Sequence, residues 1–89
     1  MGQGEAPERR TRAATRLEKR SLTLNGHATS VALEPLFWQV LEAWAAERDL
    51  STAALIAEID AERIEGPLAS ALRVALLSYV MGPPARRPD

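Results

Sequence analysis

The stretch from Ser21 to Leu33, SLTLNGHATSVAL, contains two runs in which apolar and polar residues alternate, joined by Asn25-Gly26. Alternation with a period of two is typical of a β-strand that is covered on one face. Asn-Gly between two such runs is a strong hairpin signal, because both central residues of a type I′ turn need a positive φ. The stretch therefore predicts a β-hairpin with a two-residue loop.

A two-residue loop also fixes which residues of the two strands lie opposite each other, and it pairs Arg20 with Val31. Under this register one face of the hairpin is apolar and the other carries small and polar side chains. The apolar face should hold Leu22, Leu24, Thr29, Val31 and Leu33, and the other face Lys19, Ser21, Thr23, Ala28, Ser30 and Ala32. A ribbon of this kind should be covered by helices on its apolar side only.

The segment after the hairpin has the pattern of a helix from Pro35 to about Arg48, since proline fits the first helical turn. One helical stripe is formed by Phe37, Val40, Leu41 and Trp44. Trp38 lies at the margin of this stripe, where a tryptophan is more often a dimer contact than a part of the core.

Two further helices are predicted. Ser51 can cap a helix that runs to about Arg63 with Leu55, Ile56 and Ile59 as its buried stripe. Pro67 can begin a third helix, which should end near Met81 before Gly82-Pro83-Pro84. This helix is apolar on more than one side, with Leu68, Leu72, Leu76 and Tyr79 on one and Val74, Leu77 and Met81 on another. A chain of 89 residues can hardly bury such a helix alone, so we expect a homodimer.

Charge is unevenly distributed along the chain. Residues 1–20 carry six bases and three acids, a balance of +3, whereas residues 21–84 carry three bases and eight acids, a balance of −5. Residues 1–18 lack apolar periodicity and predict a flexible basic arm, and residues 83–89 predict a disordered tail. The chain has no cysteine and no stretch as long and apolar as a membrane span, so we expect a cytoplasmic protein without a membrane partner.

The order of these elements resembles the ribbon-helix-helix superfamily: a strand with small polar outward residues, Leu33-Glu34-Pro35 opening one helix, and Asp49-Leu50-Ser51-Thr52 leading into the next. The string from Lys19-Arg20-Ser21 to Phe37-Trp38 is similar to a group of short bacterial members of this superfamily. The resemblance implies a mainly α fold with a short β-ribbon. It places a ribbon-helix-helix domain over residues 19–82, with an N-terminal β-hairpin, an added C-terminal helix and a homodimeric assembly.

The resemblance also implies a function, that of a transcriptional regulator which binds double-stranded DNA. Strands from two subunits would pair and enter the major groove, while the start of the second helix would face phosphate. The base-facing places fall on Lys19, Ser21, Thr23, Ala28, Ser30 and Ala32, and the phosphate contacts on Arg12, Arg16, Arg20, Ser51 and Thr52. The chain departs from the family's pattern at Ala28, where a basic or amide residue is common, and alanine cannot make a bidentate base contact. Specificity would then depend on the first strand, on the basic arm or on DNA shape.

The sequence contains no pattern that indicates an enzyme, a cofactor or a metal site. It has one histidine, no cysteine and no glycine-rich phosphate loop. His27 is expected to close the hairpin beside Leu24, since one imidazole without nearby ligands makes no metal site. The alternative function is a protein-interaction module, an adaptor or antitoxin-like dimer that grips a protein partner and has lost contact with DNA.

Overall fold

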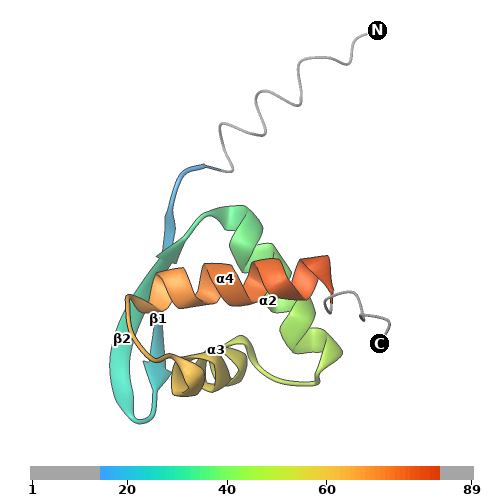
Figure 1. Ribbon diagram of the computed structural model, residues 1–89. Coiled ribbons are helices and arrows are strands. Elements are labelled where there is room, and N and C mark those ends of the chain that lie inside the picture. The colour runs from blue at the N-terminus through green and yellow to red at the C-terminus, as the bar shows by residue number, and fades with distance from the viewer. Residues whose placement is uncertain (1–14, 83–89) are drawn as a thin grey trace, which may run out of the picture.

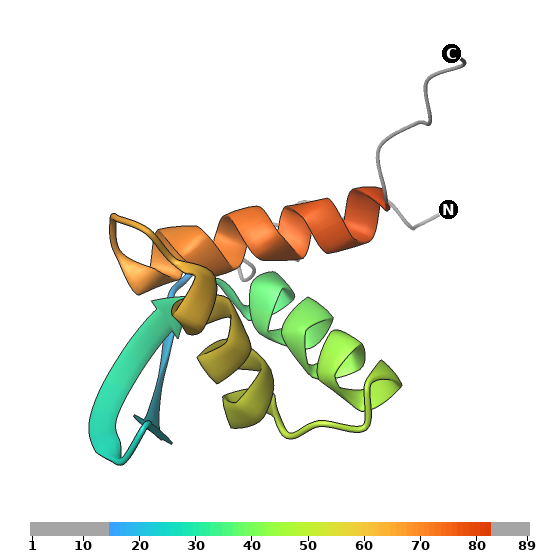
Figure 2. The same ribbon diagram turned by 60° about the horizontal axis from the view of Figure 1, so that its bottom comes forward.

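The computed structural model describes residues 15–82, which form a β-hairpin and three helices (Figure 1). The elements follow the order β1 (Glu18–Leu24), β2 (His27–Leu33), α2 (Pro35–Glu47), α3 (Thr52–Glu62) and α4 (Leu68–Met81). The hairpin lies at one side of the helices, and α4 lies across α2 and α3 (Figures 1 and 2). None of the helices in this part of the chain is both long and apolar enough to cross a membrane.

The hairpin turns at Asn25 and Gly26, whose φ angles are 52° and 82°. These two positive angles are those of a type I′ turn, which glycine and asparagine tolerate best. β1 and β2 pair antiparallel along their full length, from Leu24 opposite His27 to Glu18 opposite Leu33. This is the register expected for the two-residue loop. Both strands of this hairpin come from one chain, and the pairing of strands from two subunits that the resemblance implied stays a prediction.

The helices begin and end close to the predicted residues. α2 is followed by Asp49 with a positive φ of 59°, and the amide of Leu50 donates to the carbonyl of Ala45. This arrangement closes a helix end through a left-handed residue. The hydroxyl of Ser51 then accepts a hydrogen bond of 3.0 Å from the amide of Ala54, which makes Ser51 the cap of α3. Pro67 precedes α4 as its cap residue instead of being its first helical residue.

The core is formed by side chains from every strand and helix of the described residues. Its buried members are Leu24, Val31, Leu33, Trp38, Leu41, Ala45, Leu55, Ile56, Leu72 and Leu76. The prediction that Trp38 is a marginal dimer contact is wrong, because its side chain is 1% exposed and is the largest fully buried group. α2 presents two adjoining apolar sides to its surroundings. Trp38, Leu41 and Ala45 are fully buried, whereas Phe37, Val40 and Trp44 are only partly buried.

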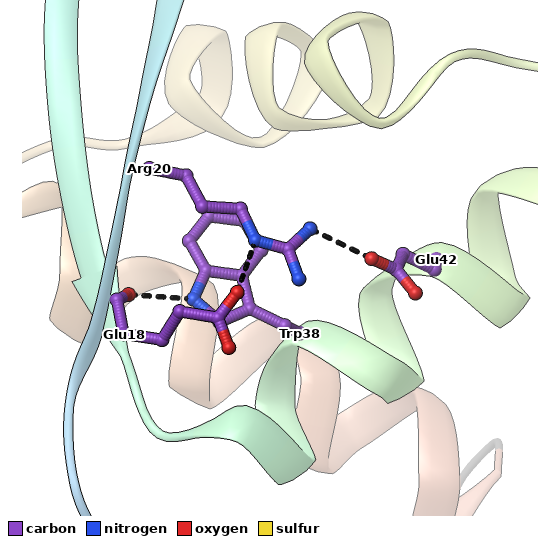
Figure 3. Close-up of polar contacts among 4 residues, drawn as sticks. All are labelled: Glu18, Arg20, Trp38 and Glu42. Carbon is purple, nitrogen blue, oxygen red and sulfur yellow. Dashed lines mark hydrogen bonds and ion pairs between the residues drawn. The ribbon is translucent and has the colours of Figure 1, made fainter.

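Trp38 is fixed to β1 by two kinds of contact (Figure 3). Its indole Nε1 donates a 2.8 Å hydrogen bond to the backbone carbonyl of Glu18. The guanidinium of Arg20 lies over the ring, 4.4 Å from its centroid, in cation–π geometry. The same guanidinium pairs with the carboxylates of Glu18 and Glu42 at 2.6 and 2.7 Å. Hydrogen bonds to the two carboxylates raise the pKa of Arg20 above its ordinary value, and the bond to Glu42 has the larger effect.

Two side-chain contacts tie α4 to the segment that begins α2 and to α2 itself. Arg73 pairs with Glu34 at 3.0 Å, and the rings of Trp44 and Tyr79 stack with centroids 4.7 Å apart. A hydrogen bond from its own backbone amide, and the pair with Arg73, lower the pKa of Glu34, although desolvation opposes them. A lowered pKa stabilises the fold above the ordinary pKa of glutamate, and this contribution is lost as the pH falls through the lowered value.

Leu33→Ala should destabilise the protein by about 2–4 kcal/mol, because it removes a fully buried side chain and leaves a cavity between the hairpin and the helices. Leu36→Ala is the matched control, since Leu36 is 58% exposed, and the loss there should stay within about 0.5 kcal/mol. Urea denaturation followed by circular dichroism measures both. Equal losses for the two variants would contradict the burial of Leu33.

Trp38→Phe should cost about 1–3 kcal/mol, because it leaves the Glu18 carbonyl without its donor and removes part of the ring under Arg20. Trp44→Phe is the control, since phenylalanine can still stack on Tyr79, and it should cost less. The measurement is the free energy of unfolding, with amide hydrogen exchange of β1 as a second readout. Faster exchange in β1 for Trp38→Phe alone is expected, and unchanged exchange would contradict the role of Trp38 in fastening β1.

Candidate nucleic-acid interface

The outward face of the hairpin carries the six residues that were predicted to face DNA bases. They form three cross-strand pairs, Lys19 with Ala32, Ser21 with Ser30 and Thr23 with Ala28. Five of them are exposed and Ala32 is half-buried. The helices cover the opposite face, where Leu24, Val31 and Leu33 are buried. Alternation along two short strands thus separates the core from a narrow hydrophilic strip.

The centre of this strip is a pair of hydroxyl groups, because Ser21 and Ser30 occupy the middle positions of their strands. Hydroxyl groups donate and accept hydrogen bonds, so they can contact either kind of base edge. β1 also contributes Thr23 and Lys19, whereas Ala28 and Ala32 of β2 offer only methyl groups. The capacity for hydrogen bonds therefore lies mainly on β1.

Positive charge at this face is sparse. Residues 15–82 carry six bases against nine acids, a balance of −3. Four arginines, namely Arg20, Arg48, Arg63 and Arg73, are engaged in ion pairs. Lys19 and Arg16 are exposed, and no ion pair within residues 15–82 engages them. The cations available to a polyanion in this part of the chain are therefore the two at the start of β1.

Arg20 lies on the covered side of the hairpin, not with the outward residues. Its guanidinium is held between Glu18, Glu42 and the Trp38 ring, so a phosphate would have to compete with two carboxylates. The expected register already carried this information, since it places Arg20 opposite Val31, on the same face as Leu22 and Leu24. Glu18 lies on the same strand two residues before Arg20, and therefore on the same face. The acceptor Glu42 had no such signal in the sequence, because its contact with Arg20 joins the hairpin to α2.

The other expected phosphate contacts lie at the start of α3 or outside the described residues. Ser51 is exposed and caps the helix, and Thr52 is half-buried in its first turn. The first amides of a helix have no partner within it, so they can bind an anion. Arg12 and the rest of residues 1–14 lie outside the described residues. The same is true of the expected C-terminal tail. β1 begins at Glu18, one residue before the boundary expected for the domain.

The described residues hold no group of three or more histidine, cysteine or acidic side chains that could bind a metal ion. His27 is exposed beside the hairpin turn, opposite Leu24. Neither observation adds a chemical function to the outward face. Its side chains can offer hydrogen bonds and one ammonium group to a ligand.

Comparison with known proteins agrees with this architecture. A family model described as "Ribbon-helix-helix domain" matches residues 17–80. Among solved structures, the chain is similar to an uncharacterized protein from Bordetella pertussis Tohama I, with 37% sequence identity and a TM-score of 0.70. The match covers 79% of this chain and 60% of that structure's chain. A search of curated proteins gives no match.

The matched range begins next to β1 and ends within α4, so it includes the hairpin, α2, α3 and most of the added helix. The hairpin, its outward hydrophilic strip and the two helices that follow are thus parts of one recognised domain. By this match over most of its length, the chain belongs to the ribbon-helix-helix domain family.

Proposed function

We propose that this protein is a DNA-binding transcriptional regulator whose hairpin presents its outward face to the major groove. Domains of this family commonly dimerise and bind DNA, and we propose a homodimer here. The observation that carries the proposal is the outward strip itself: an exposed two-stranded ribbon without a bulky apolar side chain, built from three cross-strand pairs. A two-stranded ribbon has the width that the major groove of B-DNA admits.

The distribution of charge supports different roles in DNA binding for the N-terminal segment and for the outward strip of the hairpin. Residues 15–82 carry excess acid, so phosphate would repel them unless cations at one place reverse the local charge. Those cations are Lys19 in β1 and Arg16 just before it, preceded along the chain by Arg9, Arg10 and Arg12 of the N-terminal segment. We propose that this segment supplies most of the affinity through phosphate contacts. The hydroxyl groups of the strip then supply a modest base preference.

A second candidate function is a protein-interaction module, either an adaptor or an antitoxin-like dimer. Two observations favour it. The outward face of β2 has alanine on either side of Ser30, at Ala28 and Ala32, and alanine has no side chain that could form a hydrogen bond with a base. Residues 15–82 also carry more acidic than basic side chains. The two functions differ in one measurement. No shift of any duplex by the full-length protein at about 50 mM salt, where phosphate contacts count most, would reject DNA binding and leave the adaptor.

The affinity for duplex DNA should fall steeply with salt, because each phosphate contact releases condensed counterions. Lys19→Ala should reduce the slope of log K against log salt by about 1, and deletion of residues 1–14 should reduce it further. Fluorescence anisotropy with a labelled duplex at several salt concentrations measures the slope.

Arg63→Ala is the matched control for charge, since Arg63 is exposed at the end of α3 and is paired with Asp60. It should leave the slope unchanged. Equal effects of Lys19→Ala and Arg63→Ala would show that the cations act through net charge alone, which contradicts contact at the start of β1.

The double variant Ser21→Ala/Ser30→Ala should leave the melting temperature nearly unchanged, because both side chains are exposed and lie opposite each other outside the core. It should alter the sequences recovered when the protein selects from random duplex DNA, since the hydroxyl contacts to base edges are lost. Gln39→Ala, an exposed polar residue of α2, is the control and should recover the same sequences as the unaltered protein. A large drop in melting temperature for the serine variant would show that the two serines face the core, which contradicts the assignment of the two faces.

A further inference from the structure

A groove of about 520 Å³ lies where α3 ends and α4 begins, and no residue of the outward strip lines it. Figure 2 shows the connection between the two helices, which pack against each other beside the groove. The floor of the groove is apolar and is formed by Ile59, Ala71, Val74 and Ala75. Because two of these residues are alanines, a segment with small side chains can approach the floor closely.

The rim of the groove is acidic. Glu62 at the end of α3 and Glu65 in the connection line it together with Arg63, and all three are exposed. Arg63 is paired with Asp60 at 2.8 Å and donates to the carbonyl of Gly66 at 2.6 Å. No ion pair within residues 15–82 engages Glu62 or Glu65. The groove therefore offers two carboxylates above an apolar floor.

This combination is complementary to a segment that carries cations beside small apolar residues. The N-terminal segment of the chain has such a stretch. Residues 9–14, RRTRAA, contain three arginines and two alanines, and they contain no acid. Their charge of +3 is opposite in sign to that of the rim and to the balance of −3 over residues 15–82.

The same stretch is close enough along the chain to reach the groove. β1 begins at Glu18, opposite the last residue of β2, and the next residue of the chain, Glu34, is bound to Arg73 of α4 at 3.0 Å. Val74 of the groove floor directly follows Arg73. The start of β1 and the groove thus adjoin the same part of α4. Residues 9–14 precede Glu18 by four to nine residues, which span up to roughly 13–30 Å at ~3.3 Å per residue.

We propose that residues 9–14 dock in this groove while the protein is free of DNA, with arginines at Glu62 and Glu65, and leave it when the protein binds DNA. The inference rests on the proposed function, which assigns the same arginines to phosphate. Carboxylate and phosphate are both anionic acceptors for a guanidinium group, so each arginine can serve one of them at a time. The groove is then an intramolecular competitor of DNA.

The expected effect of this competition is moderate. Exposed ion pairs are individually weak, so the docked and released forms exchange. If the docked form holds roughly 70–90% of the molecules at low salt, only ~10–30% are competent to use the arginines on DNA. Release of the segment should then raise the affinity for DNA ~3–10-fold.

The double variant Glu62→Gln/Glu65→Gln of the full-length protein tests the competition. It should bind a labelled duplex ~3–10-fold more tightly at about 50 mM salt, and the gain should shrink as salt screens the docked pairs. Glu47→Gln/Asp49→Asn is the matched control, because it removes the same charge from exposed residues that do not line the groove. It should change the affinity less than ~2-fold, and equal gains from both variants would overturn the proposal.

A second background shows whether the gain passes through the segment. In a protein with Arg9, Arg10 and Arg12 all replaced by glutamine, the change Glu62→Gln/Glu65→Gln should give no gain in affinity. A gain of the same size in this background would contradict docking of these arginines. Circular dichroism checks that each variant remains folded.

Docking can also be detected without DNA. The chain has no cysteine, so Ala6→Cys allows a single nitroxide label on the N-terminal segment. The label should broaden the amide resonances of Ile64, Ala71 and Val74 at low salt, and the broadening should weaken in Glu62→Gln/Glu65→Gln. No broadening at the groove would overturn the proposal. So would broadening seen only between labelled and isotope-enriched copies in a mixture, because it would place the segment of a second copy there.

The failure of this inference can be told apart from the failure of the proposed function. Broadening at the groove that Glu62→Gln/Glu65→Gln removes, in a protein that binds no duplex, supports the docking site and rejects the regulator. DNA binding whose salt slope depends on Lys19, in a protein without broadening at the groove, supports the regulator and rejects the docking site.

Discussion

The covering of Trp38 by β1 is the constraint on which the rest of this structure depends. The indole is the largest fully buried group, and its Nε1–H would lack a partner if the Glu18 carbonyl did not lie above it. A buried donor without an acceptor costs about 1–3 kcal/mol, so the position of the strand and the burial of the ring are coupled. Arg20 closes the assembly from the solvent side by stacking on the ring and pairing with Glu18 and Glu42.

This coupling explains how one copy of a short chain closes a core. The hairpin gives the ribbon its second strand, and α2, α3 and α4 cover a single apolar face. The same arrangement divides the surface into three regions with different chemistry. They are the hydrophilic strip of the hairpin, the acidic sides of α2 and α3, and the uncharged outer side of α4. Each region suits a different neighbour, and only the first contains an exposed cation outside an ion pair within residues 15–82.

The placement of cations gives the proposed DNA contact its character. Four of the six bases in the described chain are used to hold elements together, which leaves Lys19 and Arg16 for a polyanion. An acidic body with cations at one end of a ribbon favours binding that is strongly dependent on salt and on the N-terminal segment. The alanines of β2 limit direct readout, since a methyl group can meet a thymine methyl but makes no hydrogen bond. The proposed homodimer would compensate by bringing two such weak ribbons into one assembly.

The sequence alone determined the turn, the register and the limits of the helices, because each rests on a local rule. Asn25-Gly26 sets the hairpin, alternation assigns its faces, and Ser51 caps α3 through atoms three residues away. Only the tertiary structure decided the role of Trp38 and of Arg20. Periodicity alone allows each of these side chains more than one neighbour. The neighbours were fixed by contacts between residues 20 to 22 positions apart, namely Trp38 with Glu18 and Arg20 with Glu42. The uncovered side of α4 was likewise decided by packing, since a helix that is apolar on more than one side does not specify which of its sides a core will take.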